Sequence, residues 1–373
     1  MTAMSSGLKR YRLASAAKKG IAAGKQGGKM NLKEFSRLVG LSQTTVSRAL
    51  SGYPEVRAET RARVQEAALK FGYHPNRSAT GLATGRAGAV GIVFRGGSEF
   101  GPHTSEFMGG LGSRLEDDQI DILISTVETP EEEIATYRRL AASKRVDAVI
   151  LHSPVLKDGR IALLNQLGLP FVMHGRTEAP SGYAYLDIDN FGAIKRATSH
   201  LLDLGHRRIG FINGFKGRTF AEHRDQGYRT ALAERGIEPD PALFGNGEFT
   251  DEVGYRFMLA FLSNPQPPTA VLAGSMMSAL GAMRAIRAEG LMLGRDISLV
   301  AHDDVFAYIN ADNMVPTVST TRSSIRSAGS RVGEFLIQLL SGKNPDEIHE
   351  VWPVELVLRE STGPAPLKLA SAG

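Results

Sequence analysis

Beyond residue 86 the chain alternates short, almost continuously apolar runs with longer amphipathic segments. The runs lie at 89–94, 120–125, 146–151, 170–174, 208–213, 269–274 and 297–302, and helically spaced segments include 107–117, 131–142, 193–204 and 278–289. A strand is apolar on both faces where helices cover both sides of its sheet, so this alternation predicts buried parallel β-strands. The long gap from 174 to 208 favours two sheets. We therefore expect an α/β body of two lobes, each a doubly wound parallel sheet.

The sequence has 373 residues, no cysteine and a formal net charge of +5. This length predicts two or three domains. The absence of cysteine excludes a disulfide scaffold, a zinc finger, a thiol nucleophile and an iron–sulfur cluster, and it fits a protein of the reducing cytoplasm. No apolar run reaches about 18 residues, so neither a membrane span nor a membrane partner is expected.

Positive charge is concentrated at the N-terminal end. Residues 1–29 carry seven Lys or Arg and no acid, residues 30–88 carry nine basic and four acidic residues, and the remainder carries 28 basic and 35 acidic residues. This asymmetry favours a polyanionic partner, with a solvated tail of no function as the alternative for residues 1–29. That tail lacks the apolar core of a signal peptide and, like residues 367–373, is predicted to be disordered.

The segment after the tail has the spacing and the breaks of short helices. Apolar residues recur at Leu32, Phe35 and Val39, on one face of a first helix that Gly40 would end. Ser42 is a favourable N-cap for a second helix. A short helix, a glycine turn and a second helix make a helix-turn-helix, a motif with which proteins read DNA.

A third helix is expected over about residues 58–71, between the break at 52–54 and a stop at Gly72. Its inward-facing residues are predicted to be Val64, Ala67, Ala68 and Phe71. Residues 30–75 are therefore predicted to form an α-helical helix-turn-helix DNA-binding domain.

In a helix-turn-helix the N-terminal end of the second helix reads base edges in the major groove. Here that helix would display Gln43, Thr44, Ser47 and Arg48. Gln can bond adenine and Arg can bond guanine in a bidentate manner, while the Ser42 hydroxyl and the amides of the helix start suit a phosphate. The alternative is an ordinary polar helix face, because three-helix packing by itself is weak evidence.

Ligands of parallel α/β sheets bind beyond the carboxyl ends of the strands. Polar residues at those ends include Ser153, His174, Ser275 and Asp303. No nucleophile elbow, P-loop or dinucleotide fingerprint occurs, so neither an enzyme nor a cofactor is expected. The adjacent residues 302–304 would point in different directions, so no metal site is predicted. The glycine-rich segment 109–112 has a helical period and is interpreted as packing.

The exact amino-acid sequences of several segments identify a protein family more specifically than these patterns do. It includes Gly40-Leu-Ser-Gln-Thr-Thr-Val-Ser-Arg-Ala-Leu50 and Gly72-Tyr-His-Pro-Asn76 near the N-terminus, and Leu204-Gly-His-Arg-Arg-Ile-Gly-Phe-Ile212 and Arg224-Asp-Gln-Gly-Tyr-Arg-Thr-Ala-Leu232 in the body. The chain thereby resembles the lactose-repressor (LacI/GalR) family of bacterial transcription regulators over residues 30–360. A weaker resemblance, through residues 100–107, is to repressors of α-glucoside utilisation (AglR-like).

The resemblance implies a homodimeric repressor that grips double-stranded, pseudo-palindromic operator DNA. Residues 76–86 would be a hinge that folds into a helix on DNA, with Asn76 among the DNA contacts and Leu82 wedged into the minor groove. Gly81 departs from this pattern because glycine weakens a helix. A plain flexible linker is the alternative for this segment.

The resemblance also implies a core like that of a periplasmic sugar-binding protein, in which a mono- or disaccharide effector alters operator affinity. Arg224 matches the arginine that grips effector oxygens, Phe249 an aromatic residue that stacks on the ligand, and Asp303 the acid that closes the site. An ion pair with Asp225 or Glu222 is the alternative for Arg224. His103, Ser105, Glu106, Ser153, His174 and Ser275 complete the expected effector site. Where the family usually has Asn-Asp, this chain has Gly274-Ser275, which removes a carboxylate.

These observations predict an effector-binding and dimerisation core at 87–366. Its first lobe is expected at about 87–189 and 322–349, and its second at about 190–319 and 350–366. The predicted function is ligand-controlled regulation of carbohydrate-utilisation genes, with an α-glucoside as the effector. The alternative is a sugar- or purine-type binding protein, or an enzyme, with an incidental helix-turn-helix.

Overall fold

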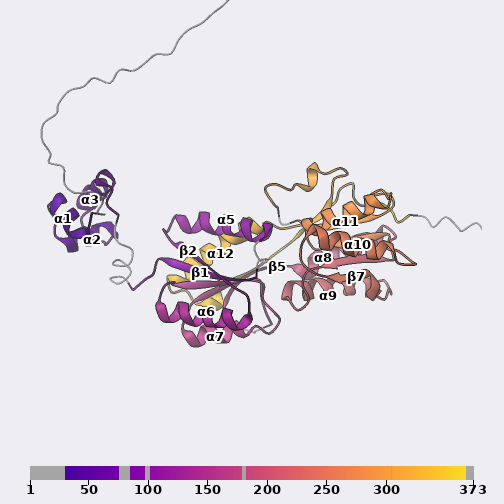
Figure 1. The fold of residues 1–373 in the computed structure, drawn as a ribbon, viewed down its shortest axis with the longest axis horizontal. Helices are drawn as coiled ribbons and strands as arrows, with labels where there is room; N and C mark the ends of the chain where they lie inside the picture. The colour runs from indigo at the N-terminus through magenta and orange to yellow at the C-terminus, as the bar shows by residue number, and fades with distance from the viewer. Residues whose placement is uncertain (1–29, 75–84, 97–100, 179–181, 304, 367–373) are drawn as a thin grey trace, which may run out of the picture. The chain divides into compact units, whose positions relative to one another are not determined.

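The computed structural model describes residues 30–74, 85–96, 101–178, 182–303 and 305–366, apart from the side chain of Asp303 (Figure 1). The chain divides into two compact units, residues 1–80 and 81–373, and each is described by itself. Within the described ranges, no helix is both long and apolar enough to span a membrane.

Within residues 30–74, the N-terminal unit forms the helices α1 (Leu32–Val39), α2 (Gln43–Leu50) and α3 (Ala58–Phe71). Gly40 and Gly72 end α1 and α3 in the left-handed conformation, which glycine adopts without the penalty of a Cβ atom. Asn31 caps α1 and exchanges two hydrogen bonds with Glu34. The helix-turn-helix predicted from the sequence is confirmed, including its two glycine stops.

The core of this unit is built around Phe35, Val46 and Val64, none of which has exposed surface. The prediction that Phe71 faces inward is wrong, because its side chain is 41% exposed. Tyr73 fills that part of the core instead and stacks on Phe35 with ring centroids 4.2 Å apart. The left-handed turn at Gly72 reverses the chain and brings Tyr73 back onto the helices.

The larger unit contains two lobes, and each has a six-stranded sheet. The first sheet has the order β11-β5-β4-β3-β1-β2 and is parallel throughout. Its strands are β1 (Ala89–Arg95), β2 (Asp121–Val127), β3 (Ala148–Leu151), β4 (Phe171–His174), β5 (Ala184–Ile188) and β11 (His349–Trp352).

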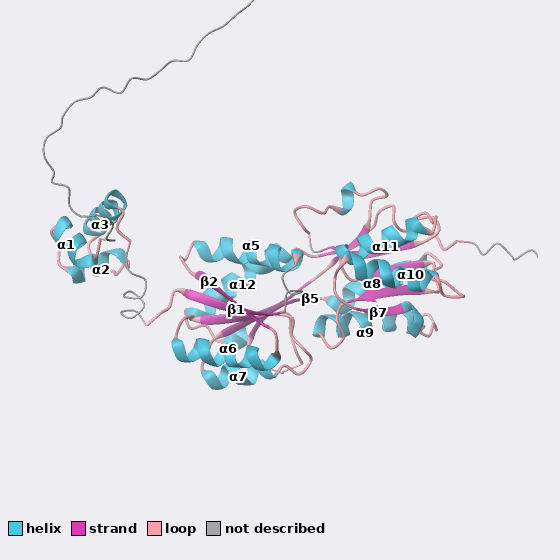
Figure 2. Cartoon of the chain, viewed as in Figure 1, coloured by secondary structure: helices cyan, strands magenta, loops and turns pink. Residues whose placement is uncertain are grey.

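Helices cover both faces of the first sheet (Figure 2). One face packs against α5 (Pro102–Glu116) and α12 (Ile325–Leu340), and the other against α6 (Pro130–Ser143) and α7 (Gly159–Leu167). This two-sided cover explains why the strands β1 and β3 are almost continuously apolar.

The second sheet has the order β12-β10-β9-β8-β6-β7 and is parallel except for β12, which is antiparallel to β10. Its strands are β6 (Ile209–Asn213), β7 (Phe244–Asn246), β8 (Ala270–Ala273), β9 (Ser298–Asp303), β10 (Ser319–Arg322) and β12 (Glu355–Val357). The helices α8 (Asn190–Asp203) and α9 (Thr219–Ala233) pack on one face, and α10 (Asp251–Leu262) and α11 (Met276–Ala288) on the other. Short 3-10 turns lie at Pro241–Leu243, Ala311–Asn313 and Pro345–Glu347.

The chain crosses between the lobes after β5, after β10 and after β11. The sequence places residues 350–352 in the second lobe, but β11 pairs with β5 and so belongs to the first sheet. The last crossing therefore lies between Trp352 and Glu355. The strand β10 is missing from the predicted runs because its sequence is Ser-Thr-Thr-Arg, yet Ser319 and Thr320 are fully buried.

Glycines on both helices allow α5 and α12 to cross closely. A Cβ atom on Gly110 would lie 1.8 Å from the carbonyl oxygen of Arg326, and one on Gly329 would lie 2.0 Å from that of Phe107. Only glycine lets the two helices approach to this distance. The interpretation of the segment 109–112 as packing is thus confirmed at Gly110.

Candidate functional site

The helix α2 carries the predicted DNA-reading residues. Gln43, Thr44 and Arg48 are exposed, and Ser47 is half-buried. The Ser42 hydroxyl accepts a hydrogen bond from the backbone N–H of Thr45 at 3.1 Å, so it caps the helix as predicted. Asn76 and Leu82 lie outside the described residues.

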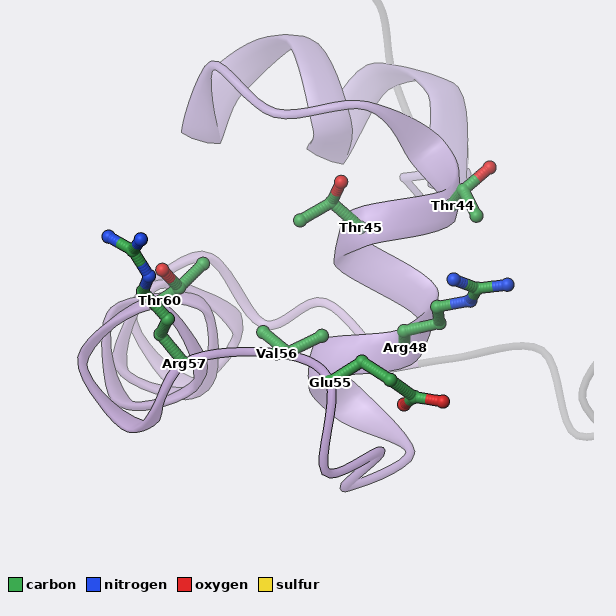
Figure 3. A pocket seen from close by; sticks show the side chains of 7 residues that line it. All are labelled: Thr44, Thr45, Arg48, Glu55, Val56, Arg57 and Thr60. Atoms are coloured by element: carbon green, nitrogen blue, oxygen red, sulfur yellow. The ribbon is translucent and has the colours of Figure 1, made fainter.

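A groove of about 290 Å³ lies beside this helix (Figure 3). Its lining residues are Thr44, Thr45, Arg48, Glu55, Val56, Arg57 and Thr60. The groove thus joins the outer face of α2 to the start of α3. Arg57 is exposed at the N-terminal end of α3, where the helix dipole also favours an anion. The surface can present base-reading groups on α2 and a phosphate contact on α3.

Arg224, a predicted effector residue, is buried among elements of the second lobe. Its side chain projects from α9 and is 4% exposed. Its Nε donates to Asn190 Oδ1 at 2.8 Å, and its Nη1 donates to the carbonyl oxygen of Gly274 at 2.9 Å. A buried guanidinium needs such partners, because a charge without them is costly to remove from water.

The two acids considered as partners of Arg224 are engaged elsewhere. Asp225 pairs with Arg229, one helical turn further along α9, at 2.8 Å. The carboxylate of Glu222 accepts a hydrogen bond from the backbone N–H of Gly217 at 2.9 Å. The contacts of Arg224 therefore turn away from the outer face of its own helix and toward the ends of other elements.

Asn190 links Arg224 to the first lobe. Its side-chain amide donates to Asp187 Oδ1 at 3.3 Å, and the other carboxylate oxygen pairs with Arg176 Nε at 3.2 Å. Burial raises the pKa of Asp187 to about 6, although Arg176 opposes this shift. A polar network thus connects β5 of the first lobe to α9 of the second.

Aromatic rings from both lobes meet near Arg224. The Phe249 ring lies 5.8 Å from the Phe220 ring and 5.6 Å from the imidazole of His103, which belongs to the first lobe. The Arg224 guanidinium lies over Phe220 at 5.2 Å and over Phe249 at 6.0 Å. His103 also contacts Phe306 edge-on at 4.9 Å. We call Phe220, Phe249, His103 and Arg224 the aromatic junction.

Other residues expected to meet the effector have different surroundings. Ser275 has no exposed surface, and its hydroxyl caps α11 by accepting from the Ser278 backbone N–H at 3.1 Å. The buried Glu106 carboxylate accepts from Ala307 N–H at 3.4 Å and pairs with Arg326 at 3.3 Å. The side chains of Ser275 and Glu106 therefore both bond to other groups of the protein.

The remaining predicted residues lie on the first lobe or at the end of β9. His174 stacks on Phe107 at 4.7 Å, and Ser105 is exposed on α5. Asp303 is the last residue of β9, and its side chain lies outside the described part of the chain. Across the described ranges, no group of three or more His, Asp or Glu is arranged to hold a metal ion.

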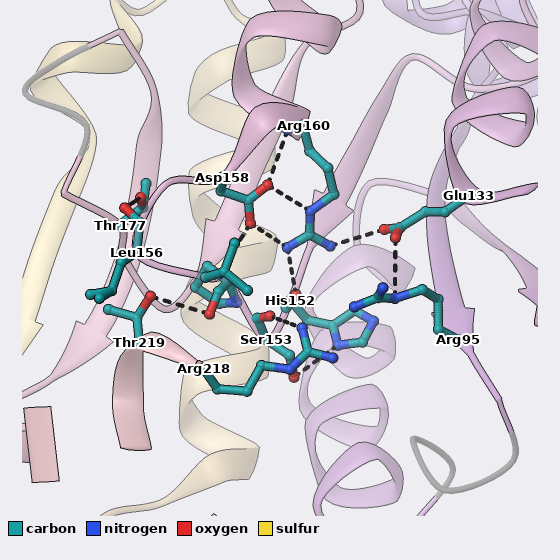
Figure 4. Close-up of polar contacts among 12 residues, drawn as sticks. Arg95, Glu133, His152, Ser153, Leu156, Asp158, Arg160, Thr177, Arg218 and Thr219 are labelled. Carbon is teal, nitrogen blue, oxygen red and sulfur yellow. Dashed lines mark hydrogen bonds and ion pairs between the residues drawn. The ribbon is translucent and has the colours of Figure 1, made fainter. Parts of the chain in front are cut away.

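Ser153 belongs to a loop on which the second lobe docks (Figure 4). Its carbonyl oxygen accepts from Arg218 Nη1, and that of Pro154 accepts from the backbone N–H of Thr219 at 2.9 Å. Arg160, on α7 of the first lobe, supports this loop by donating to the carbonyl oxygen of His152 at 3.1 Å. The lobes therefore meet through backbone groups as well as through the aromatic junction.

A charged cluster supports this loop from within the first lobe. Glu133 pairs with Arg160 at 2.9 Å and with Arg95, the last residue of β1, at 3.3 Å. Arg160 also pairs with Asp158 at 2.7 Å. Beside this cluster, burial and the nearby arginines lower the pKa of His152 to about 4. The imidazole is therefore neutral at physiological pH.

Phe220, Asn190 and Asp187 were not expected from the sequence. A signal for Phe220 was present, because it precedes Arg224 by one helical turn and so shares its face of α9. Asn190 and Asp187 carry no comparable signal, because they reach Arg224 only through the crossing between the lobes.

Comparison with known proteins agrees with both units. Residues 31–76 match the family model of bacterial regulatory proteins of the lacI family, and residues 198–362 match a periplasmic binding protein-like domain. The transcriptional regulator AglR of Rhizobium meliloti (strain 1021) is 48% identical over 342 residues, which cover 90% of this chain and 95% of that protein. Like AglR, the RafR protein of Escherichia coli, 32% identical over 87% of this chain and 96% of its own length, is named an HTH-type transcriptional regulator.

Solved structures show the same architecture. The Lac repressor dimer bound to operator and the anti-inducer ONPF has a TM-score of 0.77 at 25% identity, covering 90% of this chain and all of that one. A complex of the regulator CelR with cellobiose has a TM-score of 0.66 at 29% identity, covering 89% and 99%. The chain therefore belongs to the LacI family of bacterial regulatory proteins and is a helix-turn-helix transcriptional regulator.

Proposed function

We propose that the protein is a homodimeric repressor of carbohydrate-utilisation genes that binds a pseudo-palindromic operator and responds to a small sugar, an α-glucoside. It acts in the cytoplasm, where its DNA is. The reading groups are Gln43, Thr44, Ser47 and Arg48 on α2. The effector site is at the aromatic junction, with Asp303 at the end of the neighbouring strand.

The observation that carries this proposal is the environment of Arg224. A guanidinium fork can hold two vicinal oxygens, and aromatic rings offer surface to the apolar face of a sugar. Both groups lie at the carboxyl ends of strands in the second sheet, where ligands of such sheets bind. The rings of Phe249 and His103 come from different lobes, so a ligand held there contacts both. Such a ligand can bias the arrangement of the lobes.

The solved relatives support the proposal that this protein binds a sugar and DNA. One solved relative is a complex with cellobiose and another is a complex with operator DNA. An effector can change operator affinity only if it binds the two states of the protein differently, and the effect is then reciprocal.

The test uses the full-length chain and a duplex that the protein itself selects from a random-sequence pool. Operator affinity is measured by fluorescence anisotropy at one salt concentration, with and without maltose, trehalose, sucrose and methyl α-glucoside. We expect a selected sequence with two inverted half-sites and an affinity that changes at least tenfold with one of these sugars. A pool without enrichment would favour the alternative, a binding protein or enzyme with an incidental helix-turn-helix. Enrichment without any sugar response would reject the sugar effector alone.

A further inference from the structure

Two glycines leave room for the rings of Phe220 and Phe249 at the carboxyl end of the second sheet. Gly214 follows β6, and a Cβ atom there would lie 2.5 Å from the Phe220 ring and 2.9 Å from the Phe249 ring. Gly274 follows β8, and a Cβ atom there would lie 3.0 Å from the Phe249 ring. Any larger residue at Gly214 would displace both rings from the strand ends.

Gly274 and Ser275 both have structural roles at the end of β8. Gly274 makes room for Phe249 and offers its carbonyl oxygen to Arg224. Ser275 is fully buried as the cap of α11 and presents no polar group to a ligand. The end of β8 therefore lies against an aromatic ring.

Both rings retain accessible surface. Phe220 and Phe249 are half-buried, whereas Phe211 and Phe261, which pack inside the same lobe, are at most 2% exposed. The two half-buried rings are inclined to each other by 44° at a centroid separation of 5.8 Å, so they form two adjoining surfaces with different orientations. Phe244 and Phe257 are half-buried too, but they pack against the core clusters of this lobe, to which neither Phe220 nor Phe249 belongs.

We propose that Phe220 is a second stacking surface beside Phe249, which makes the effector site selective for a ligand of two linked sugar rings over a single ring. This inference rests on the proposed sugar-controlled function. One sugar ring lies against Phe249, where His103 approaches from the other lobe, and the next lies against Phe220. Arg224, placed over both phenyl rings, holds hydroxyl oxygens near the linkage.

The test measures sugar binding to the full-length protein by isothermal titration calorimetry. The probes are maltose, trehalose and sucrose as two-ring ligands, and methyl α-glucoside as the one-ring ligand. The unchanged protein is expected to bind at least one disaccharide roughly tenfold more tightly than methyl α-glucoside, the scale of one aromatic contact. Phe220→Leu is expected to abolish this preference, because it lowers the affinity for the disaccharide by roughly tenfold.

Three further variants make the result decisive. Phe220→Trp keeps an aromatic surface and should retain the disaccharide preference. Phe220→Met keeps the apolar volume and replaces Phe220→Leu if thermal melting shows that the latter is unfolded. Phe215→Leu alters an exposed ring five residues earlier and should change no sugar affinity.

The outcomes separate this inference from the proposed function. If the unchanged protein binds disaccharides but shows no preference over methyl α-glucoside, or if Phe220→Leu and Phe220→Met keep that preference, the inference is wrong and the sugar effector stands. If the unchanged protein binds none of the four sugars, the proposed effector and the inference both fail.

Discussion

At the scale of single residues, Arg224 shows how one side chain can serve stability and recognition together. Its contacts with Asn190 and Gly274 hold together the start of α8, the end of β8 and α9. Through Asn190 it also reaches Asp187 of the first lobe. A change at Arg224 should therefore affect both folding and ligand binding.

Two substitutions separate these roles. Arg224→Lys keeps the charge near Asp187 but loses the planar fork, so we expect at least tenfold weaker maltose or sucrose binding and a stability loss of about 1 kcal/mol. Arg224→Met also leaves Asn190 and the Gly274 carbonyl without a donor, and should cost roughly 1–3 kcal/mol of the free energy of unfolding. Calorimetry and urea denaturation measure the two effects. An Arg224→Lys variant with unchanged sugar affinity would remove Arg224 from the effector site.

His152 predicts a pH dependence of stability. Its pKa in the folded protein is about 4, against 6.5 when unfolded, so the stability it contributes is present above pH 6.5 and is lost as the pH falls toward 4. Between pH 7 and 4.5 the unchanged protein should lose roughly 1–3 kcal/mol more than His152→Gln, which has no imidazole to protonate. Urea denaturation of both proteins at each pH tests this. Parallel pH profiles would show that the imidazole can be protonated in the folded state without cost.

At the scale of elements, α2 and the start of α3 divide the recognition of DNA between them. Arg48 lies on the exposed face of α2, and Arg57 lies at the N-terminal end of α3 on the same groove. A side chain on the recognition helix reads bases, and a cation at a helix start contacts the sugar–phosphate backbone. The two arginines should therefore behave differently when removed.

Arg48→Ala should cost roughly 1–3 kcal/mol of specific binding and relax the base preference at one position of each half-site. Arg57→Ala should weaken binding to selected and scrambled duplexes alike and reduce the slope of log affinity against log salt by about one. Anisotropy titrations over a range of KCl concentrations distinguish these results. Equal loss on both duplexes for Arg48→Ala would mean that α2 does not present Arg48 to the bases.

The crossing of α5 and α12 gives a matched pair of glycine substitutions. A Cβ atom on Gly110 would clash with the backbone of Arg326, so Gly110→Ala should destabilise the protein by about 1–3 kcal/mol or more. On Gly112 the nearest atom to a Cβ would be 3.9 Å away, so Gly112→Ala should stabilise it by up to about 1 kcal/mol. Urea denaturation measures both. Similar effects of the two changes would contradict the close crossing.

At the scale of the whole molecule, the charge is divided between a basic N-terminal quarter and an acidic body. This division favours a polyanion at one end only and opposes non-specific binding of DNA by the rest of the chain. Removal of residues 1–29, which carry seven basic residues and no acid, should weaken binding to every duplex and flatten its salt dependence. Anisotropy titration of the shortened and full-length chains in KCl tests this. An unchanged salt slope would show that the tail does not contact DNA.

The sequence by itself determined the helix-turn-helix, seven of the strands and the position of Arg224 on an amphipathic helix. These features depend on local properties, namely the period of apolar residues, the N-cap at Ser42 and the glycines that end α1 and α3. Such features do not depend on contacts with distant parts of the chain, so they can be predicted from one short segment at a time.

Only the tertiary structure decided which side chains fill the core and which remain accessible. Tyr73 rather than Phe71 packs on Phe35, and the polar strand β10 is buried because Ser319 bonds the distant carbonyl of Arg359. Ser275 is buried as the cap of α11 and so is not available to a ligand. Phe220 lies beside Phe249 because Gly214 leaves room for both rings. Each outcome depends on contacts between segments far apart in the chain, and such contacts exist only once the sheets and their crossings have brought the segments together.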